Sequence, residues 1–228
     1  MSNPKDKRIL VNFGSGPATK PTDWIDYDGS LNASINRLPL FVAQLLRRSF
    51  ALVSRGRVYE FPRHVRYLRL AERIRLPTDY ADVVFASHVW EHLYRDDAEA
   101  VTRECRRILK PGGVLRLIVP DLRVYCERYI SGGNPAAAEE LNDALLFYGR
   151  RAPRGLVKRL MLCAGNLHTH KFMYDGPALV RLVEVCGFVE AHERELYESA
   201  VPEIRQVESP ERGSRGAGVI VECRKPGN

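Results

Sequence analysis

Short apolar runs alternate with amphipathic stretches along most of this chain. The runs predict strands at residues 8–13, 24–27, 64–70, 82–87, 114–119, 188–196 and 218–223. Runs 82–87 and 114–119 are apolar enough to be buried on both faces of a sheet, as central parallel strands are. The last two runs, joined by a polar loop, predict a closing hairpin-like pair.

Helical periodicity fills the spaces between the strands. An apolar stripe from Ala98 to Leu109 predicts a helix that Asp96-Asp97 can cap and that Lys110-Pro111-Gly112-Gly113 ends. Asp175-Gly176-Pro177 opens another helix, which Gly187 ends. Because strands and helices alternate, we expect a three-layer α/β fold around a mostly parallel sheet with a C-terminal antiparallel strand pair.

Two segments depart from this alternation. Residues 122–163 have a mostly helical pattern, and residues 38–53 form a strongly apolar helix interrupted by Gln44 and Arg47-Arg48. That apolar helix fits either a cover or lid over the core or a segment that docks on a membrane surface. We therefore expect one domain over residues 1–228, with helical cap insertions at about 31–61 and 122–170.

The composition of the chain indicates which cellular compartment and which classes of partner to expect. The 228 residues include no apolar run near the ~20 needed to span a bilayer. The N-terminus is polar and the five cysteines are scattered, which predicts a cytoplasmic protein with reduced thiols. The net charge of +7 is compatible with an acidic substrate, with peripheral contact with an anionic membrane or with RNA, and equally with a solvated arginine-rich surface. Nucleic acid is not expected, because the arginine clusters are not interleaved with aromatic residues.

Candidate chemistry begins where the first strand ends in Gly14-Ser15-Gly16, with Asp28 after the second strand. Glycines there let a ligand approach the backbone, and an acid at the tip of the next strand can accept hydrogen bonds from a ribose diol. Thr19 stands where a dinucleotide-binding loop has its third glycine, and residues 17–23 are too few for a full crossover helix. The sequence thus favours an adenosine ligand without phosphates.

Further motifs give the chain a family resemblance. Those motifs are Asn12-Phe13-Gly14-Ser15-Gly16, Trp24-Ile25-Asp26-Tyr27-Asp28, Leu76-Pro77, Glu91-His92-Leu93, Arg107-Ile108-Leu109-Lys110-Pro111-Gly112-Gly113, Val119-Pro120-Asp121 and His170-Lys171-Phe172-Met173-Tyr174-Asp175. With them the chain resembles class I S-adenosylmethionine-dependent methyltransferases, in particular the methyltransferase type 11 branch. The resemblance covers residues 8–125 well and implies a Rossmann-like fold with S-adenosylmethionine as cofactor.

The resemblance also assigns roles to individual residues. It implies that the backbone of Gly14, Ser15 and Gly16 contacts the methionine end of the cofactor and that Asp28 binds the ribose. Ser87 and His88 would line the pocket beside the sulfonium. The family commonly has an acid before leucine-proline for the adenine amino group, but here that position is Leu70, followed by Ala71 and Glu72 as substitutes.

The sequence says least about the molecule that accepts the methyl group. A hydroxyl acceptor needs a base, and histidine is suited to that role near neutral pH. His92, His170 and His88 are the candidates, with Glu91 orienting His92. His168 and His170 are spaced for a metal, but no third ligand is evident in sequence, so we expect no metal site. We expect O-methylation of a small molecule or glycan; the alternative is a methyltransferase-like scaffold module without methyl transfer.

Overall fold

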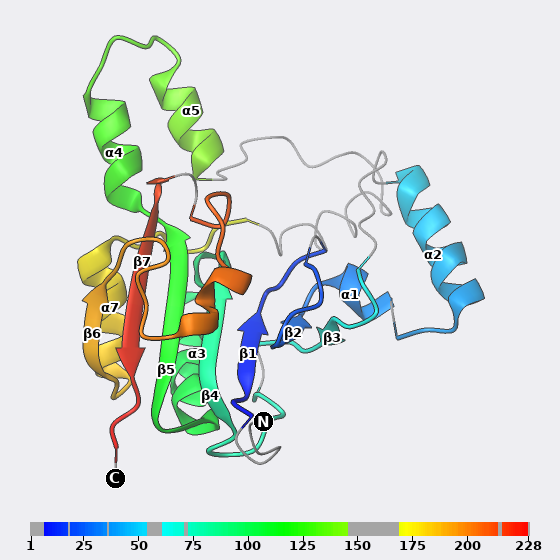
Figure 1. The fold of residues 1–228 in the computed structure, drawn as a ribbon. Coiled ribbons are helices and arrows are strands. Elements are labelled where there is room, and N and C mark those ends of the chain that lie inside the picture. Colours follow the sequence, from blue (N-terminus) through cyan, green and yellow to red (C-terminus); the bar gives the residue numbers. More distant parts are fainter. Residues whose placement is uncertain are drawn as a thin grey trace.

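The computed structural model describes residues 7–17, 19–35, 37–53, 61–70, 73–145, 169–213 and 216–227, and its elements surround one mixed sheet (Figure 1). Within these residues the sheet has seven strands in the order β3-β2-β1-β4-β5-β7-β6. The strands are β1 (Leu10–Phe13), β2 (Trp24–Asp28), β3 (Arg66–Tyr67), β4 (Ala81–Ser87), β5 (Leu109–Pro120), β6 (Val189–Glu193) and β7 (Gly218–Arg224).

Strand directions confirm the expected topology. Strand β1 lies parallel between β2 and β4, and β5 continues parallel beside β4. Strand β7 then runs antiparallel to both β5 and β6. The carboxyl ends of the parallel strands consequently meet at one edge of the sheet, where α/β proteins place their ligands.

Helices α3 (Arg95–Ile108) and α7 (Gly176–Val185) cover one face of the sheet. The predicted stripe of α3 is buried, and the side chain of Asp175 caps α7 by accepting a 2.9 Å hydrogen bond from the amide of Ala178. The expected capping by Asp96 and Asp97 is wrong: Tyr94 is the N-cap of α3 and makes no side-chain cap bond. These two acids lie in the first turn, where their charge still favours the helix N-terminus.

The opposite face has a different cover. No helix lies between β1 and β2 in the described residues, as the short crossover predicted. The 3-10 helix η4 (Pro202–Gln206) and its flanking chain pack there instead, with Val201, Ile204 and Val207 against Trp24 and Phe85 (Figure 1). A C-terminal segment thus completes the third layer where a crossover helix does not fit.

The boundaries of two strands differ from those expected. The alternation at 64–70 yields only the two-residue strand β3, whereas β5 begins at Leu109 instead of 114. Strand β5 starts at Leu109 because Leu109 pairs with Ala81 of β4, and residues 110–113 form an irregularity, with Gly112 at a φ of 75°, before Val114 pairs with Val83. The amide of Gly112 donates to the carbonyl of Lys225 at 3.0 Å, and the amide of Lys225 donates to the carbonyl of Gly113 at 2.9 Å.

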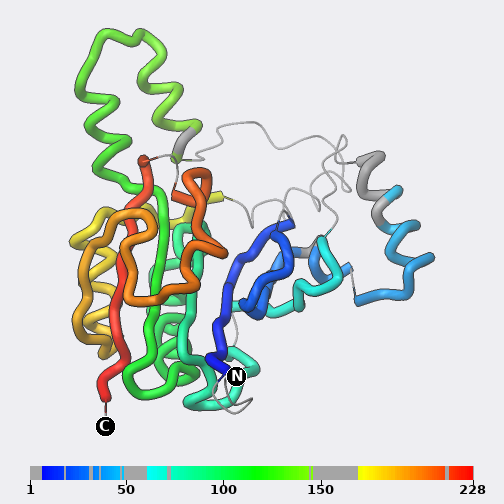
Figure 2. Tube along the Cα trace, in the orientation of Figure 1, coloured from blue at the N-terminus to red at the C-terminus, as the bar shows by residue number. Residues whose placement is uncertain are grey.

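The described parts of the two insertions are helical. The first contains α1 (Leu31–Ile35) and α2 (Leu40–Val53), and the second contains α4 (Leu122–Ile130) and α5 (Ala137–Ala144), which form a hairpin beyond the carboxyl end of β5 (Figures 1 and 2). Residues 54–60 and 146–168 lie outside the described residues. The division into one domain with two caps stays a prediction.

Helix α2 stands apart from the sheet (Figure 2). Its Ala43 is buried, whereas Leu40, Phe41 and Leu45 are exposed, Phe41 to 74%. The described side chains therefore do not support a role for α2 as a cover over the main core. Among the described residues, no helix combines the length and the apolar character required to cross a membrane.

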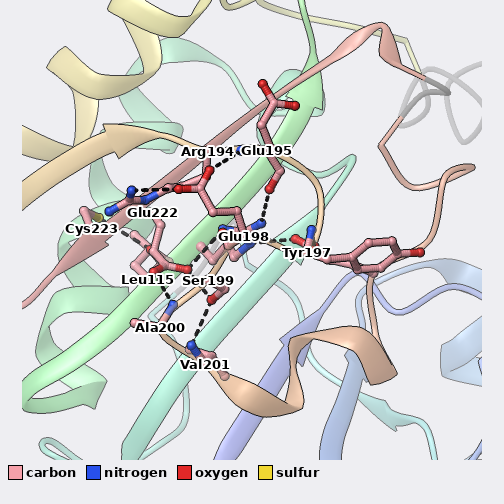
Figure 3. A network of polar contacts seen from close by, with 12 residues as sticks. Leu115, Arg194, Glu195, Tyr197, Glu198, Ser199, Ala200, Val201, Glu222 and Cys223 are labelled. Atoms are coloured by element: carbon pink, nitrogen blue, oxygen red, sulfur yellow. Dashed lines mark hydrogen bonds and ion pairs between the residues drawn. The ribbon is translucent and has the colours of Figure 1, made fainter.

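A buried polar network ties the cover of the second face to the sheet. Arg116 of β5 is fully buried and donates to Glu208 at 2.6 Å and to Glu222 of β7 at 3.1 Å. It also donates to the carbonyls of Glu198 at 2.8 Å and Glu195 at 3.1 Å. Figure 3 shows the surrounding contacts, in which Ser199 and Ala200 approach Glu222. The network fixes the segment that leads to residues 209–213.

Candidate active site

The loop after β1 has the backbone that its glycines predicted. Gly14 and Gly16 have φ of 66° and 73°, a region that side chains disfavour. A Cβ on Gly14 would lie 2.2 Å from Cγ2 of Val89, so that position also lacks room for a side chain. A Cβ on Gly16 would meet nothing within 4 Å. Gly16 therefore leaves its backbone open to an approaching ligand.

Asp28 lies against this loop, as expected. Its Oδ2 accepts a 3.1 Å hydrogen bond from the amide of Gly16, and its Oδ1 accepts a 2.8 Å bond from the amide of Ser30. The amide of Ser15 donates to the carbonyl of Tyr27, while its side-chain hydroxyl is buried without a partner in the described structure. Each oxygen of Asp28 keeps a further lone pair, so the carboxylate can still accept from a diol.

Asp26 is a second carboxylate beneath the loop. It is buried, and its Oδ1 accepts a 2.6 Å hydrogen bond from the side-chain amide of Asn12. Burial raises the pKa of Asp26, against the lowering effects of Asn12, His64, Thr19 and Arg212. Two acids thus lie under the glycine loop, of which sequence reasoning assigned a role only to Asp28.

Ser87 and His88, at the end of β4, contact a distant loop of the protein. The Ser87 hydroxyl donates to the carbonyl of Arg212 at 3.3 Å, and Nε2 of His88 lies 2.9 Å from the same oxygen. Nδ1 of His88 lies 3.1 Å from Oε1 of Glu91. Burial alone would lower the pKa of His88, but hydrogen bonds to Glu91 and Arg212 and the Glu91 charge raise it. Because protein acceptors engage both ring nitrogens, the geometry favours a positioning role over that of a base.

Arg212 is a candidate site residue that sequence reasoning missed. Its Nη2 donates to the carbonyl of Ser15, and its Nη1 is buried with no hydrogen-bond partner among the described residues. Burial lowers the pKa of Arg212, while Asp26 and Asp28 raise it. No local motif marks this arginine, and it lies 124 residues from His88, so only the folded chain brings it to the loop.

A second cluster follows β4 in the 3-10 helix η2 (Trp90–His92). Glu91, His92 and His170 each place a ligand-type atom within 4.8 Å of the others. The His92 and His170 rings lie 5.0 Å apart, and Nε2 of His92 is 4.0 Å from Oε1 of Glu91. Burial lowers the pKa of His170, and His92 and His88 lower it further against the effect of Glu91. The candidates His92 and His170 are thus brought together although they are far apart in sequence.

The chain segment that carries His170 is held by backbone bonds. The amides of Lys171 and Phe172 both donate to the carbonyl of Glu91, at 2.6 and 3.3 Å. Nδ1 of His92 lies 3.3 Å from the carbonyl of Thr169. Since a carbonyl only accepts, this contact places the proton on Nδ1 and leaves the lone pair on Nε2 of His92.

Three of the residues predicted from sequence lie outside the part of the chain that the structure describes. Ala71, Glu72 and His168 lie outside the described residues, so their roles stay predictions. Leu70, where the family commonly has an acid, is partly buried and packs against the main core.

An arginine-rich cavity of about 1000 Å³ lies beside β3. Six of its lining residues are arginines: Arg37, Arg63, Arg66, Arg69, Arg73 and Arg75. Leu68 and Arg69 also line it, and their backbone lies against Gly29, directly after Asp28. The cavity is therefore adjacent to the expected ribose position and strongly basic among its described residues.

Comparisons with known proteins agree with this architecture. Residues 52–117, which include β4, α3 and the first part of β5, match the family model described as a methyltransferase domain. A Mycolicibacterium smegmatis protein named probable S-adenosylmethionine-dependent methyltransferase is 39% identical over 87 residues. That alignment spans 38% of this chain and only 33% of the relative, so the chain covers about a third of the relative's length.

Two solved structures also align with most of this chain at low sequence identity. One is a SAM-dependent methyltransferase from Archaeoglobus fulgidus, with a TM-score of 0.47, 16% identity and coverage of 97% of this chain and 87% of that one. The other is an O-methyltransferase family protein from Burkholderia thailandensis, with a TM-score of 0.47, 12% identity and coverage of 97% and 52%. The sheet order with its antiparallel β7 is that of the class I, Rossmann-like methyltransferase fold, and residues 52–117 are similar to a methyltransferase domain.

Proposed function

We propose that this protein transfers a methyl group from S-adenosylmethionine to a hydroxyl of a small molecule or glycan. The observation that carries the proposal is the convergence of a ligand-ready glycine loop, Asp28 and Arg212 next to the cluster of Glu91, His92 and His170. This arrangement supports a cofactor site and a proton acceptor at neighbouring strand ends. When bound, the cofactor supplies an activated methyl group, so the protein need not provide a nucleophile of its own.

The residues present fit that cofactor. Asp28 would accept hydrogen bonds from the ribose hydroxyls, and the backbone at Gly16 is open to close approach. The buried Nη1 of Arg212 is a hydrogen-bond donor without an acceptor among the described residues. The carboxylate of the cofactor's methionine part is the acceptor that best suits a guanidinium. No crossover helix follows β1 among the described residues, which removes a phosphate anchor but none of these contacts.

The acceptor hydroxyl must lose its proton as the methyl group is transferred, and we place that step at the Glu91, His92 and His170 cluster. The lone pair on Nε2 of His92 can accept a proton, and the lowered pKa of His170 keeps that imidazole neutral, so that its lone pair is available near neutral pH. The α4–α5 hairpin, beyond the end of β5, would form part of the acceptor-binding cap (Figure 1).

The arginine-lined cavity supports an acceptor that carries an acidic group. Guanidinium groups pair with carboxylates, sulfates and phosphates through charge-assisted hydrogen bonds. We therefore expect acidic sugars or acidic small molecules to be methylated in preference to neutral analogues of the same size.

Calorimetric titration with S-adenosylhomocysteine tests the cofactor site. Asp28→Asn and Arg212→Met should each weaken binding by about 10- to 100-fold, the usual effect of losing a hydrogen bond to a charged group. Arg205→Met is the matched control, because Arg205 is exposed on the same C-terminal segment and contacts Tyr197. No binding by the wild type, or equal binding by all variants, would overturn the proposal.

Turnover then separates the enzyme from the scaffold alternative. Formation of S-adenosylhomocysteine from S-adenosylmethionine would be followed over paired acidic and neutral hydroxyl acceptors. Product with acidic acceptors supports the proposal. Tight cofactor binding with no turnover over the whole panel would instead favour a binding module, an alternative motivated by Leu70 and the short first crossover.

A further inference from the structure

We propose that Glu91, His92 and His170 bind one divalent transition-metal ion. Sequence alone argued against a metal, because His168 and His170 had no third ligand nearby. The fold supplies two ligands from another part of the chain, since η2 places Glu91 and His92 beside His170. The result is a two-histidine, one-carboxylate set on two segments held together by backbone hydrogen bonds.

Two of the three side chains have buried atoms that the protein does not satisfy. The side chain of Glu91 is 1% exposed, yet its Oε2 has no hydrogen-bond partner in the described structure. Nδ1 of His170 is also buried without such a partner. Buried polar groups normally have partners, and a carboxylate most of all. A cation between these atoms accounts for both.

Neighbouring groups orient the ligands through hydrogen bonds, as they do in metalloproteins. The Thr169 carbonyl accepts from Nδ1 of His92 at 3.3 Å, which leaves Nε2 to coordinate. His88 contacts Oε1 of Glu91 at 3.1 Å, which orients the carboxylate and leaves Oε2 for the ion. The ammonium of Lys171 is engaged elsewhere: it donates to the Thr169 hydroxyl and lies 5.7 Å from the centre of the Tyr94 ring.

The donor set indicates which ions would bind. Two imidazoles and one carboxylate suit Zn²⁺, Mn²⁺, Fe²⁺, Co²⁺ or Ni²⁺ better than Mg²⁺ or Ca²⁺, which prefer oxygen ligands. Three protein ligands also leave coordination positions open to another molecule.

The role of the ion rests on the proposed function. An acceptor hydroxyl bound at an open position would have a lowered pKa and lose its proton to solvent. Its oxygen would then form a bond to the methyl carbon while the carbon–sulfur bond of the cofactor breaks. The electron pair of that bond stays on sulfur, which becomes the neutral thioether of S-adenosylhomocysteine. With the histidine lone pairs bound to the ion, the cluster would accept no proton itself, and the metal would take the place of the histidine base described under the proposed function.

Direct metal binding tests the site without cofactor or acceptor. Chelator-treated full-length protein would be titrated with Co²⁺ alone, followed by visible absorption and calorimetry. We expect one ion per chain with ligand-field bands, and an affinity lowered by about 100-fold or more in Glu91→Gln and in His170→Ala. His192→Ala is the matched control, because His192 is exposed on β6. Circular dichroism would establish that each variant is folded.

The outcomes are distinct. Stoichiometric binding lost in both folded site variants and kept in His192→Ala supports the metal site. No stoichiometric Co²⁺ binding, or binding unchanged in both site variants, overturns it. Neither of these results touches the cofactor titration, so failure of the metal proposal leaves the proposed methyl transfer standing.

Discussion

The buried network around Arg116 should control the stability of the whole molecule, and Arg116→Met tests that. The guanidinium is fully buried and makes four hydrogen bonds, to two carboxylates and two carbonyls. Methionine fills much of the same volume but leaves Glu208 and Glu222 without their cation. Burial then disfavours the charged form of both acids, although backbone amides of Tyr197 and Ala200 still bond to them.

The expected loss of unfolding free energy is about 3–5 kcal/mol, the usual effect of removing one partner of a buried ion pair. Because single domains are stable by only about 5–15 kcal/mol, that change is large. Urea unfolding followed by fluorescence suits the measurement, since Trp24 and Trp90 are both buried. The matched control is Arg194→Met, whose 3.2 Å pair with Glu198 is partly exposed and should contribute about 0–1 kcal/mol.

A triple variant sharpens the test. Combining Arg116→Met with Glu208→Gln and Glu222→Gln removes the buried charges together, so it should recover part of the lost stability. If Arg116→Met lost no more than the Arg194→Met control, or if the triple variant recovered nothing, the unpaired buried charges would not be the cause. Because Arg212 follows the segment that Arg116 fixes, Arg116→Met should also weaken the binding of S-adenosylhomocysteine.

The remaining predictions concern the glycine loop and Asp26. Gly14→Ala should lower the free energy of unfolding by about 1–3 kcal/mol, because it adds a clash with Val89 to an unfavourable φ. Gly16→Ala has only the unfavourable φ and should lower the free energy of unfolding by about 1 kcal/mol. Equal losses in thermal melts would show that the Val89 contact is unimportant. The folded-state pKa of Asp26 is raised above 3.8 by burial, so its contribution to stability is full below the unfolded pKa and is lost as pH rises through the folded pKa. Asp26→Asn should therefore gain stability relative to wild type as pH rises from about 4 to 7, and a difference independent of pH in urea titrations would contradict the raised pKa.

Much of the fold and part of the site were determined by the sequence alone. Apolar runs specified the central strands because a strand buried on both faces must be apolar throughout. The glycine loop and Asp28 were predictable because they follow adjacent strands, and the carboxyl ends of parallel strands meet at one edge. The missing crossover helix was predictable because the connection is too short. Each of these features depends on residues that are close together in the chain, so the sequence is enough to predict it.

Other features depended on contacts between distant segments. Strand β5 begins at Leu109 because Leu109 pairs with Ala81 of β4, and the backbone of Lys225 holds the Gly112-Gly113 irregularity that follows. Arg212 approaches the glycine loop, and Glu91 and His92 meet His170, only because η4 and the segment after residue 168 pack against the sheet edge. No local pattern encodes such meetings, since the side chains that form them are ordinary polar residues until packing buries them. Tertiary structure therefore decided which charged groups surround the candidate site, while the sequence predicted the loop that marks it.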